Sequence, residues 1–417
     1  MVRVVRAVSR LLRFALVAIV GYLGTLTVAA AYGSRRSRRP PPVRPQHRFA
    51  ILVPAHDEAQ VIAVTLASLD ALDYPRELFS VHVVADNCTD RTVEIATAAG
   101  VDVHDRVDAQ RPGKGPALQW LMGRLWDRGM RPDAVVFVDA DTTVDPAFLR
   151  VVDAHLARGE HAVQGHYAVR DPEGSAVVAF RAAALAARTY LRPLGRATLG
   201  GSAGLYGNGM VLRRQLLESR QWSDHLTEDI ELHLRLLMDG IKVAFAPGAR
   251  VEAEMPHTLE ASRTQHERWE RGRVEMAARF VPILVRRTIT GGPAGRIAYA
   301  DAAFDQAVPP FSIVVAATGL WTVMGGLGAL VPFRRRRLPV VPVGLLAVET
   351  VFVLSALGLS GAPAASYRAL ASAPRMVLWK VQLWLQVLIR RGGTTAWRRT
   401  RRNQPVEADT SQSACSG

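Results

Sequence analysis

Long uncharged apolar runs at both ends of the chain constrain its fold more than any other feature. Phe14 to Tyr32 is a run of 19 residues without a charge, close to the roughly 20 residues that a helix needs to cross a bilayer. Two further runs, Phe311 to Val331 and Leu338 to Leu359, contain one acid between them, Glu349. The sequence therefore predicts membrane helices before and after a more polar middle.

Each apolar segment has a second interpretation. Ala29-Ala30-Ala31 resembles a signal-peptide cleavage site, but the four arginines within the seven residues after Tyr32 favour a retained anchor. The second pair of runs could be a buried hairpin, although its length and scarcity of charge favour spanning. Tyr367 to Arg391 mixes tryptophan and lysine with apolar residues, which indicates a helix lying in the membrane interface or a third C-terminal span.

The basic charge lies beside these apolar runs. The chain has 52 basic and 37 acidic residues, a net charge of +15, and its arginines cluster at residues 35–39, 334–337 and 390–402. This arrangement indicates contact with anionic lipids, whereas nucleic-acid binders carry such charge on a folded face. The first and last clusters place the polar middle in the cytoplasm, although the loop at 334–337 then lies outside, against the positive-inside rule.

Cysteine usage excludes two kinds of site. Cys88 and Cys415 are too few for a disulfide framework, which fits a reducing compartment. The chain has no pair of cysteines or histidines at zinc-ligand spacing, so a structural zinc site or a zinc-protease site is not expected.

Strand and helix patterns alternate through the polar middle. Short apolar runs at Phe49–Val53, Val81–Ala85 and Ala134–Val138 predict strands. Helical patterns at 58–72 and 91–99 follow the first two runs, and one at 116–128 precedes the third. Such alternation favours an α/β fold with a parallel sheet, in which ligands bind beyond the carboxyl ends of the strands.

Acidic residues follow three of the predicted strands. Glu58 comes after the first, Asp86 after the second, and Asp139 and Asp141 after the run at 134–138. Carboxylates that meet at one sheet edge suit a divalent cation and the sugar and base of a nucleotide. Lys114, between two glycines, could bind phosphate as a point charge or simply occupy a turn.

Two later motifs combine charged and aromatic residues. Thr227-Glu228-Asp229 opens a predicted helix, where acids are favoured by the helix dipole but could also supply a general base. Gln265 and Trp269 share a face of a helix that begins near Thr258, with Arg268 between them. This segment could be a solvated charged face, or it could hold a diphosphate and a sugar ring.

Taken in order, these motifs resemble those of the membrane-bound, processive-type family-2 glycosyltransferases, which include cellulose, chitin and hyaluronan synthases and ceramide glucosyltransferase. The resemblance covers about residues 48–275 and implies an α/β GT-A (Rossmann-like) domain between N-terminal and C-terminal transmembrane helices. The expected parts are an anchor with a basic linker (1–44), the GT-A domain (45–275), interface helices (276–308), a transmembrane hairpin (309–360), an amphipathic interfacial or third transmembrane helix (361–393) and a basic tail (394–417).

The resemblance also implies a role for each motif residue. Asp229 is expected to be the catalytic base, and Asp139 and Asp141 the ligands of Mg²⁺ or Mn²⁺. The acceptor is expected to contact Asn208, Glu228 and Trp269. The residues expected to bind the nucleotide sugar are Glu58, Asp86, Lys114, Asp139, Gln265, Arg268 and Trp269.

The implied activity is inverting transfer from a nucleotide sugar, UDP-glucose or UDP-N-acetylglucosamine, to a growing glycan in exopolysaccharide or cell-surface polysaccharide synthesis. The enzyme would be a multi-pass protein of the inner or plasma membrane with a cytoplasmic catalytic domain, surrounded by membrane lipids and without a nucleic-acid partner. Transfer of one sugar to a lipid is the alternative, and a non-catalytic membrane scaffold is the third hypothesis. The sequence lacks a recognisable gating loop after Trp269 and has few spans, so export of a polymer would call for a partner protein.

Overall fold

The computed structural model describes residues 2–36, 44–218, 220, 222, 227–330 and 339–389. The arginines at 38–39, 334–337 and 390–402, the tail expected at 394–417 and Cys415 lie outside these described residues. The predicted membrane orientation rests on the first and last of these clusters, with the loop at 334–337 against it, and it stays a prediction.

One eight-stranded sheet forms the centre of the polar middle, in the order β3-β2-β1-β4-β7-β6-β8-β5. The first four strands in this order are parallel, and β7 pairs antiparallel with both β4 and β6. The strands are β1 (Phe49–Ala55), β2 (Phe79–Asp86), β3 (Asp102–Arg106), β4 (Ala134–Phe137), β5 (Thr142–Val144), β6 (Ala162–Val169), β7 (Met210–Arg213) and β8 (Val243–Ala253).

The sequence predicted a parallel sheet, but the sheet is mixed, because β7 and β5 run antiparallel to their neighbours. Between β6 and β7 the chain leaves the sheet for α6 (Ala176–Ala186), the π-helix η2 (Ala187–Leu191) and α7 (Arg192–Thr198), and returns from the opposite direction. The sequence carries no short hairpin signal for this reversal, because the segment that reverses the chain is helical.

The sheet is buried on both faces, as its central strands require. Phe49, Ile51 and Val53 of β1 face one core cluster with α2 (Ile62–Asp70), α3 (Thr92–Ala98) and α5 (Phe148–Ala157). Ala50 and Leu52 face the other cluster, with α4 (Lys114–Asp127). Since successive side chains of a strand point to opposite faces, this alternation makes a three-layer domain.

Later helices continue from this domain toward the membrane segments. These are α8 (Arg214–Glu218), α9 (Glu228–Met238), α10 (Leu259–Thr290) and α11 (Pro293–Ala307), whereas the 3₁₀ turn η1 (Arg76–Leu78) lies earlier, between α2 and β2. Helix α10 runs for 32 residues, so the domain boundary predicted at residue 275 falls inside a continuous helix.

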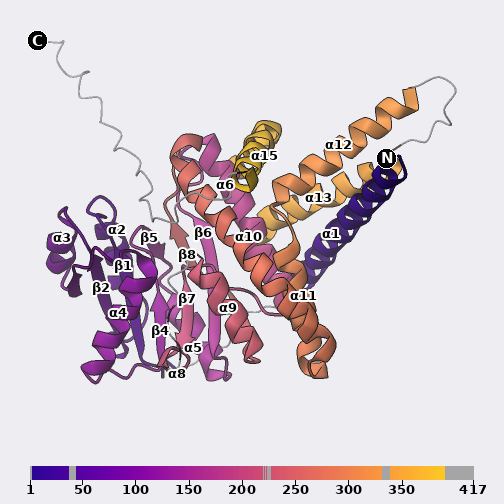
Figure 1. The fold of residues 1–417 in the computed structure, drawn as a ribbon. Coiled ribbons are helices and arrows are strands. Elements are labelled where there is room, and N and C mark those ends of the chain that lie inside the picture. The colour runs from indigo at the N-terminus through magenta and orange to yellow at the C-terminus, as the bar shows by residue number, and fades with distance from the viewer. Residues whose placement is uncertain are drawn as a thin grey trace, which may run out of the picture.

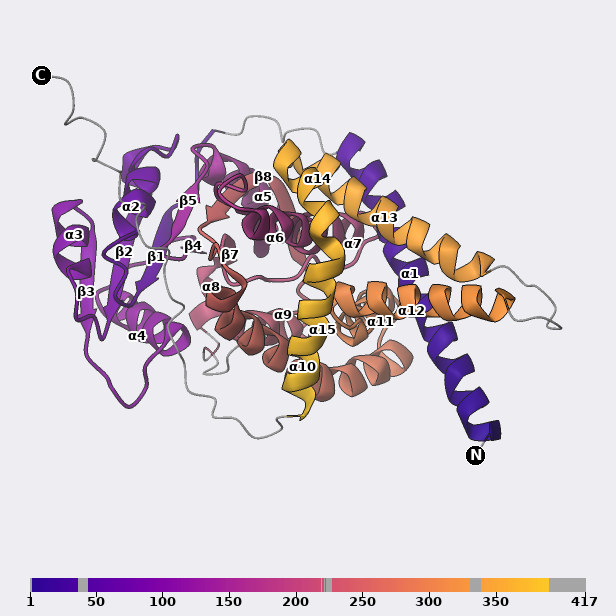
Figure 2. The same cartoon turned by 90° about the horizontal axis from the view of Figure 1, so that it is seen from above.

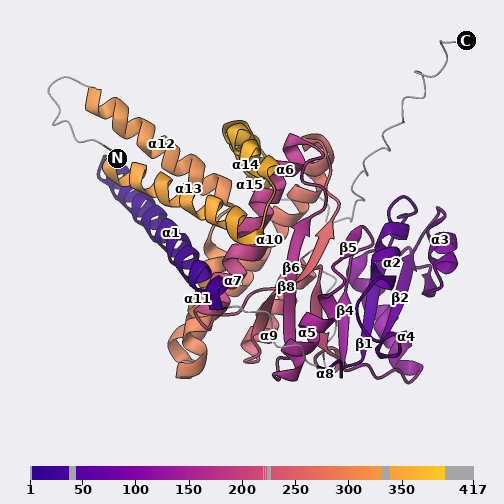
Figure 3. The same cartoon turned by 180° about the vertical axis from the view of Figure 1, so that it is seen from behind.

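Three apolar helices project together away from the sheet (Figures 1 and 3). They are α1 (Val2–Arg36), α12 (Phe311–Leu330) and α13 (Val340–Ser360). By length and composition α1 and α13 could each cross a membrane, whereas α11 and α12 qualify only together, as a pair bent by 70°. The end of α1 near the sheet buries Leu26 and Ala30 in the second core cluster.

The C-terminal helices lie across the domain. A short helix α14 (Ala364–Ala369) and a 3₁₀ turn η3 (Leu370–Ser372) lead into α15 (Ala373–Ile389). Helix α15 crosses over α10 (Figure 2), and a buried ion pair joins Lys380 to Glu270 at 2.9 Å. The segment predicted at 361–393 as an interfacial or third transmembrane helix thus contains α15, which packs against α10 and α12.

Candidate active site

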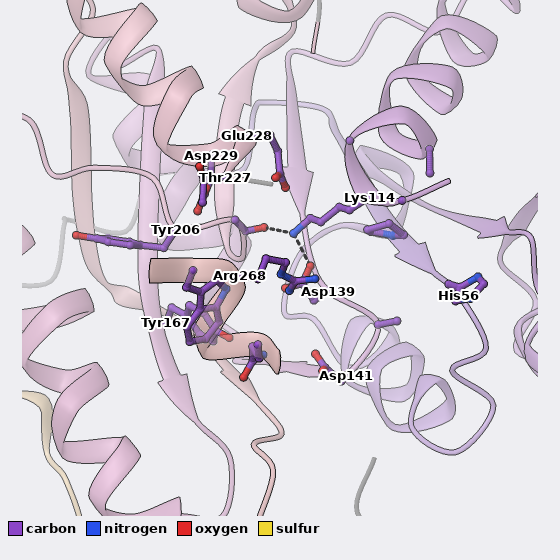
Figure 4. Close-up of a pocket in the computed structure, with 18 of the residues that line it drawn as sticks. His56, Lys114, Asp139, Asp141, Tyr167, Tyr206, Thr227, Glu228, Asp229 and Arg268 are labelled. Atoms are coloured by element: carbon purple, nitrogen blue, oxygen red, sulfur yellow. Dashed lines mark hydrogen bonds and ion pairs between the residues drawn. The ribbon is translucent and has the colours of Figure 1, made fainter. Parts of the chain in front are cut away.

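A cavity of about 460 Å³ opens where β1, β2 and β4 end. Ten of the eleven predicted site residues line it, and Figure 4 shows several of them converging from separate elements. Asn208 is the exception. The lining residues predicted from sequence are Glu58, Asp86, Lys114, Asp139, Asp141, Glu228, Asp229, Gln265, Arg268 and Trp269.

Asp86, at the end of β2, holds one wall of the cavity. Its side chain is 4% exposed and pairs with Arg106. The backbone N–H of Gly113 donates to its other carboxylate oxygen at 2.9 Å. Gly113 has a φ of 116°, which favours glycine, so this contact fixes the turn that starts α4 at Lys114.

Lys114 lies among acids at the centre of the cavity. Its Nζ donates to Asp139 Oδ1 at 2.5 Å and to the carbonyl of Gly207 at 2.6 Å (Figure 4). Burial alone would lower the pKa of Lys114, but Asp139, Glu228 and Asp229 together raise it above its ordinary value. The ammonium group is therefore charged and is held by carboxylates that a bound diphosphate could replace.

Asn208 lies behind the cavity wall and not in it. Its side chain is fully buried; its Oδ1 accepts from the backbone N–H of Asp139 at 3.2 Å, and its Nδ2 donates to Thr142 at 2.9 Å. The turn Gly207-Asn208-Gly209 has positive φ at both glycines, which directs the chain beneath the end of β4. In this structure the Asn208 side chain bonds the backbone of Asp139 and does not line the cavity, and the acceptor contact predicted for it stays a prediction.

Asp139 and Asp141 form an oxygen-only donor set that fits a hard divalent cation. Both line the cavity, together with Glu254, whose backbone N–H donates to the carbonyl of Asp141 at 3.1 Å. Mg²⁺ and Mn²⁺ take carboxylate and phosphate oxygens. Two protein carboxylates with room for a diphosphate are therefore a suitable site.

A separate group of potential metal ligands lies outside the cavity. Among the described residues, Asp57, Cys88 and Asp90 bring three ligand atoms within 4.8 Å of one another. Asp57 accepts hydrogen bonds from the backbone N–H groups of Thr89, at 2.6 Å, and Asp90. These hydrogen bonds hold the two loops together, which explains without a metal ion why the three residues lie close to one another.

Glu228 and Asp229 open helix α9 at the cavity. Burial raises the pKa of Asp229 above its ordinary range, against the charge of Lys114 and the Ile230 N–H, which donates to its Oδ1 at 2.8 Å. Burial and the adjacent Asp229 charge raise the pKa of Glu228 to about 7. Carboxylates with raised pKa values in a cavity are suited to general acid–base chemistry. Thr227 precedes them at the N-cap, but its hydroxyl does not cap the helix.

The first part of α10 supplies a cation and an aromatic plate. Gln265 accepts a hydrogen bond from Arg181 at 2.6 Å. The Nε of Arg268 is buried and has no hydrogen-bond partner within the described residues, so a donor is available in the cavity. Trp269 lies beside it in the wall.

Among the lining residues that were not predicted from sequence are His56, Tyr167, Arg188 and Tyr206. His56 Nδ1 lies 2.6 Å from the carbonyl of Asp86. His56 could have been predicted from its position directly after β1, because Glu58 was predicted from its position after the same strand. Tyr167, Arg188 and Tyr206 come from β6, η2 and the segment before β7, where the sequence shows no motif.

The chain is similar to proteins of one family in sequence. A family model described as "Glycosyltransferase like family 2" matches residues 45–272. A probable glycosyltransferase, YdaM, of Bacillus subtilis strain 168 is 28% identical over 242 residues, which cover 56% of this chain and 57% of the relative. A beta-monoglucosyldiacylglycerol synthase of Synechocystis is 29% identical over 236 residues, which cover 55% of this chain and 48% of the relative. The matches thus span about half the length of these relatives.

A solved structure is similar in fold over most of the chain. It is the mannosyltransferase PcManGT from Pyrobaculum calidifontis in complex with GDP-Man and Mn²⁺, with a TM-score of 0.53. The likeness covers 90% of this chain and 100% of that one, at 17% sequence identity.

Proposed function

Because the chain belongs to glycosyltransferase family 2 and has a GT-A-like fold, we propose that it moves a sugar, with inversion, from a nucleotide sugar to an acceptor at a membrane. The family, the fold and the enzyme class predicted from the motifs are thereby confirmed. The observation that carries the proposal is the convergence of Asp229, Lys114, Asp139 and Arg268 on one cavity.

Each of these side chains has a part in a single displacement. Asp229 accepts the proton of the acceptor hydroxyl, whose oxygen attacks the anomeric carbon while the bond from that carbon to the diphosphate breaks. Lys114 and Arg268 stabilise the negative charge of the departing nucleoside diphosphate. One base is sufficient for one inverting step, and holding donor and acceptor in the same cavity lowers the remaining barrier.

Asp139 and Asp141 would hold Mg²⁺ or Mn²⁺ against the diphosphate. The cation would act as a Lewis acid that takes up leaving-group charge. The complex of the Pyrobaculum mannosyltransferase with GDP-Man and Mn²⁺ supports a divalent cation here. Lys114 forms an ion pair with Asp139, so its ammonium group lies beside one of the carboxylates that would hold the cation and could bind the phosphates of the donor.

The donor and acceptor follow from the predicted site and from the relatives. We propose UDP-glucose or UDP-N-acetylglucosamine as donor and either a growing cell-surface glycan or a single lipid molecule as acceptor. The similarity to a beta-monoglucosyldiacylglycerol synthase and the two candidate membrane spans favour the lipid. The enzyme would lie in the inner or plasma membrane with its cavity on the cytoplasmic side, and a polymer product would require an export partner.

The first experiment measures release of nucleoside diphosphate by the detergent-purified full chain, with a panel of UDP- and GDP-sugars and with Mn²⁺ or Mg²⁺. Asp229→Asn should lower turnover at least about 100-fold, the usual contribution of a general base, while calorimetric UDP binding persists. Asp239→Asn, the same change at the exposed far end of α9, is the control and should leave turnover unchanged. Retained turnover in Asp229→Asn, or no UDP or GDP binding at all, would contradict the proposal.

A further inference from the structure

A second cavity, of about 490 Å³, lies between the catalytic domain and the apolar helices. Its walls come from α6, α10, α12, α13 and α15, which lie close together in Figures 1 and 2. Most of its lining is apolar. Representative side chains are Val177, Phe180, Val315, Leu346, Val353 and Val377.

The two cavities meet at three side chains. Leu185, Arg188 and Trp269 line both the active-site cavity and the apolar cavity. Arg188 lies in the π-helical turn η2, an irregular helix geometry that occurs frequently at functional sites. A molecule that occupies the apolar cavity therefore has the wall of the catalytic cavity at one end.

Positive charge is in excess at this junction. Arg192 and Lys380, which also line the apolar cavity, are paired with Asp305 and Glu270. Within the described residues no carboxylate forms an ion pair with Arg188 or Arg273. Arg188 lies over the ring of Tyr206, 5.9 Å from its centroid, and Arg273 donates to a backbone carbonyl at 3.2 Å.

The electrostatics at Arg273 agree with this excess. Burial, and next the charge of Arg188, lower the pKa of Arg273 to about 10. Two guanidinium groups that repel each other in a partly desolvated place form a site for an anion, because an anion would offset both charges.

A polar atom lies deeper in the apolar cavity. Glu349 of α13 is 3% exposed, and its Oε1 accepts from Thr318 at 2.7 Å. Its Oε2 is buried without a hydrogen-bond partner among the described residues. A buried polar atom without a partner is costly, and a ligand that offers a hydroxyl or ester dipole there would reduce the cost.

From these features we infer that the apolar cavity admits the acceptor, and that the acceptor is a membrane lipid whose anionic head group carries a hydroxyl. The inference rests on the proposed function. The tails lie among α6, α12, α13 and α15, and the anionic group lies against Arg188 and Arg273. The head-group hydroxyl then reaches the active-site cavity. Its proton passes to Asp229, its oxygen bonds to the anomeric carbon, and the nucleoside diphosphate leaves with the electrons of the broken bond.

Photo-crosslinking tests the site without depending on turnover. The full chain is placed in nanodiscs that contain phosphatidylglycerol or phosphatidylcholine with the same diazirine-bearing tail, and labelled peptides are identified by mass spectrometry. We expect labelling of cavity-lining peptides from α6, α13 and α15, at least fivefold stronger with phosphatidylglycerol. Arg188→Gln should remove this preference for the anionic lipid.

A matched pair of substitutions separates the cavity from the rest of the surface. Ala184 of α6 is exposed and lines the apolar cavity, so Ala184→Trp should fill it and lower cavity labelling at least fivefold. Ala98 of α3 is also exposed and lines neither cavity, so Ala98→Trp should leave labelling unchanged. Labelling that is equal for both lipids, or that Ala184→Trp does not reduce, would overturn the inference.

A second readout distinguishes failure of this inference from failure of the proposed function. In phosphatidylglycerol nanodiscs, radiolabel from the active donor should enter the organic extract as a glycolipid, and Ala184→Trp should reduce it at least tenfold. Release of nucleoside diphosphate with all radiolabel in a water-soluble polymer would refute the lipid acceptor and leave glycosyl transfer intact. Cavity labelling with no diphosphate release from any donor would support the lipid site and reject the proposed function.

Discussion

The charge of Lys114 should set the pH above which Asp229, the proposed base, is deprotonated, and Lys114→Met tests this dependence. Methionine keeps the length of the side chain but removes the charge. The ammonium group lowers the pKa of both Asp229 and Glu228, against the burial that raises them. Without it, Asp229 should hold its proton to a higher pH.

The size of the effect follows from the geometry. Lys114 Nζ and Asp229 Oδ2 lie 3.5 and 3.4 Å from the position that a Cβ of Gly207 would occupy, so the two atoms are within about 7 Å of each other. At an effective dielectric constant of about 20, unit charges at about 7 Å interact by about 2 kcal/mol. This corresponds to between about 1 and 2 pKa units for Asp229.

The assay is the pH dependence of kcat/KM for the donor, which reports the ionisations of the free enzyme. A base must be deprotonated, so activity falls as the pH drops through its pKa. Lys114→Met should move this acidic limb upward by about 1 to 2 pH units. A general loss of donor affinity would lower the whole profile without moving the limb.

A matched control is available, because Lys242 is exposed, lines neither cavity and donates only to the carbonyl of Gly200. Lys242→Met should leave the profile unchanged. If the limb of Lys114→Met stayed within about 0.3 pH units of the original, either Asp229 would not be the titrating base or the lysine would not act on it.

Three further predictions follow from single contacts. Asp141→Ala should abolish the response of diphosphate release to added Mn²⁺, and an unchanged metal titration would assign the cation elsewhere. Asn208→Leu removes two buried hydrogen bonds and should lower the free energy of unfolding by about 1–3 kcal/mol in a denaturant titration; an unaltered midpoint would contradict this. Gly272→Ala places a Cβ 2.2 Å from Cγ2 of Thr227 and should lower turnover at least tenfold by displacing the start of α9, whereas Gly123→Ala, with no atom within 4 Å, should not.

Much of the catalytic cavity could be predicted because it depends on strand ends. The apolar runs that became β1, β2 and β4 are short and continuous, and parallel strands bring their carboxyl ends to one edge. Glu58, Asp86 and Asp139 therefore meet in the structure as expected. The family motifs then located Asp229 and Arg268 without knowledge of the connections between them.

Other parts of the site depend on packing between distant segments, which one sequence does not reveal. In the sequence Arg188 is one of four arginines, with Arg181, Arg192 and Arg196, in an otherwise largely apolar helical stretch, and nothing sets it apart. It stands out in the structure because η2 packs against β6 and α13, and Arg188 lines both cavities. The direction of the Asn208 side chain also depends on a contact between distant segments. Gly207 and Gly209 on either side of it have positive φ, and its Oδ1 accepts a hydrogen bond from the backbone N–H of Asp139 at the end of β4. Neither sequence position indicates which way its side chain faces.

Helix α10 explains how one short motif serves two different environments. Gln265 and Arg268 face the active-site cavity, whereas His266, Glu270 and Arg273 line the apolar one. Residues 262, 266, 270 and 273 recur at helical spacing, so they form one stripe while 265 and 268 form another.

Trp269 lies on the border between the two stripes and belongs to both cavities. Its ring contacts His266, whose other neighbour is Trp379 of α15, with centroids 5.6 and 5.5 Å apart. The helix that crosses α10 is thus connected through two aromatic contacts to the residue between the cavities. A substitution at 265 or 268 should therefore change the use of the donor, and one at 266 or 273 the use of the lipid. A change at Trp269 should affect both, because it forms the wall that the two substrates share.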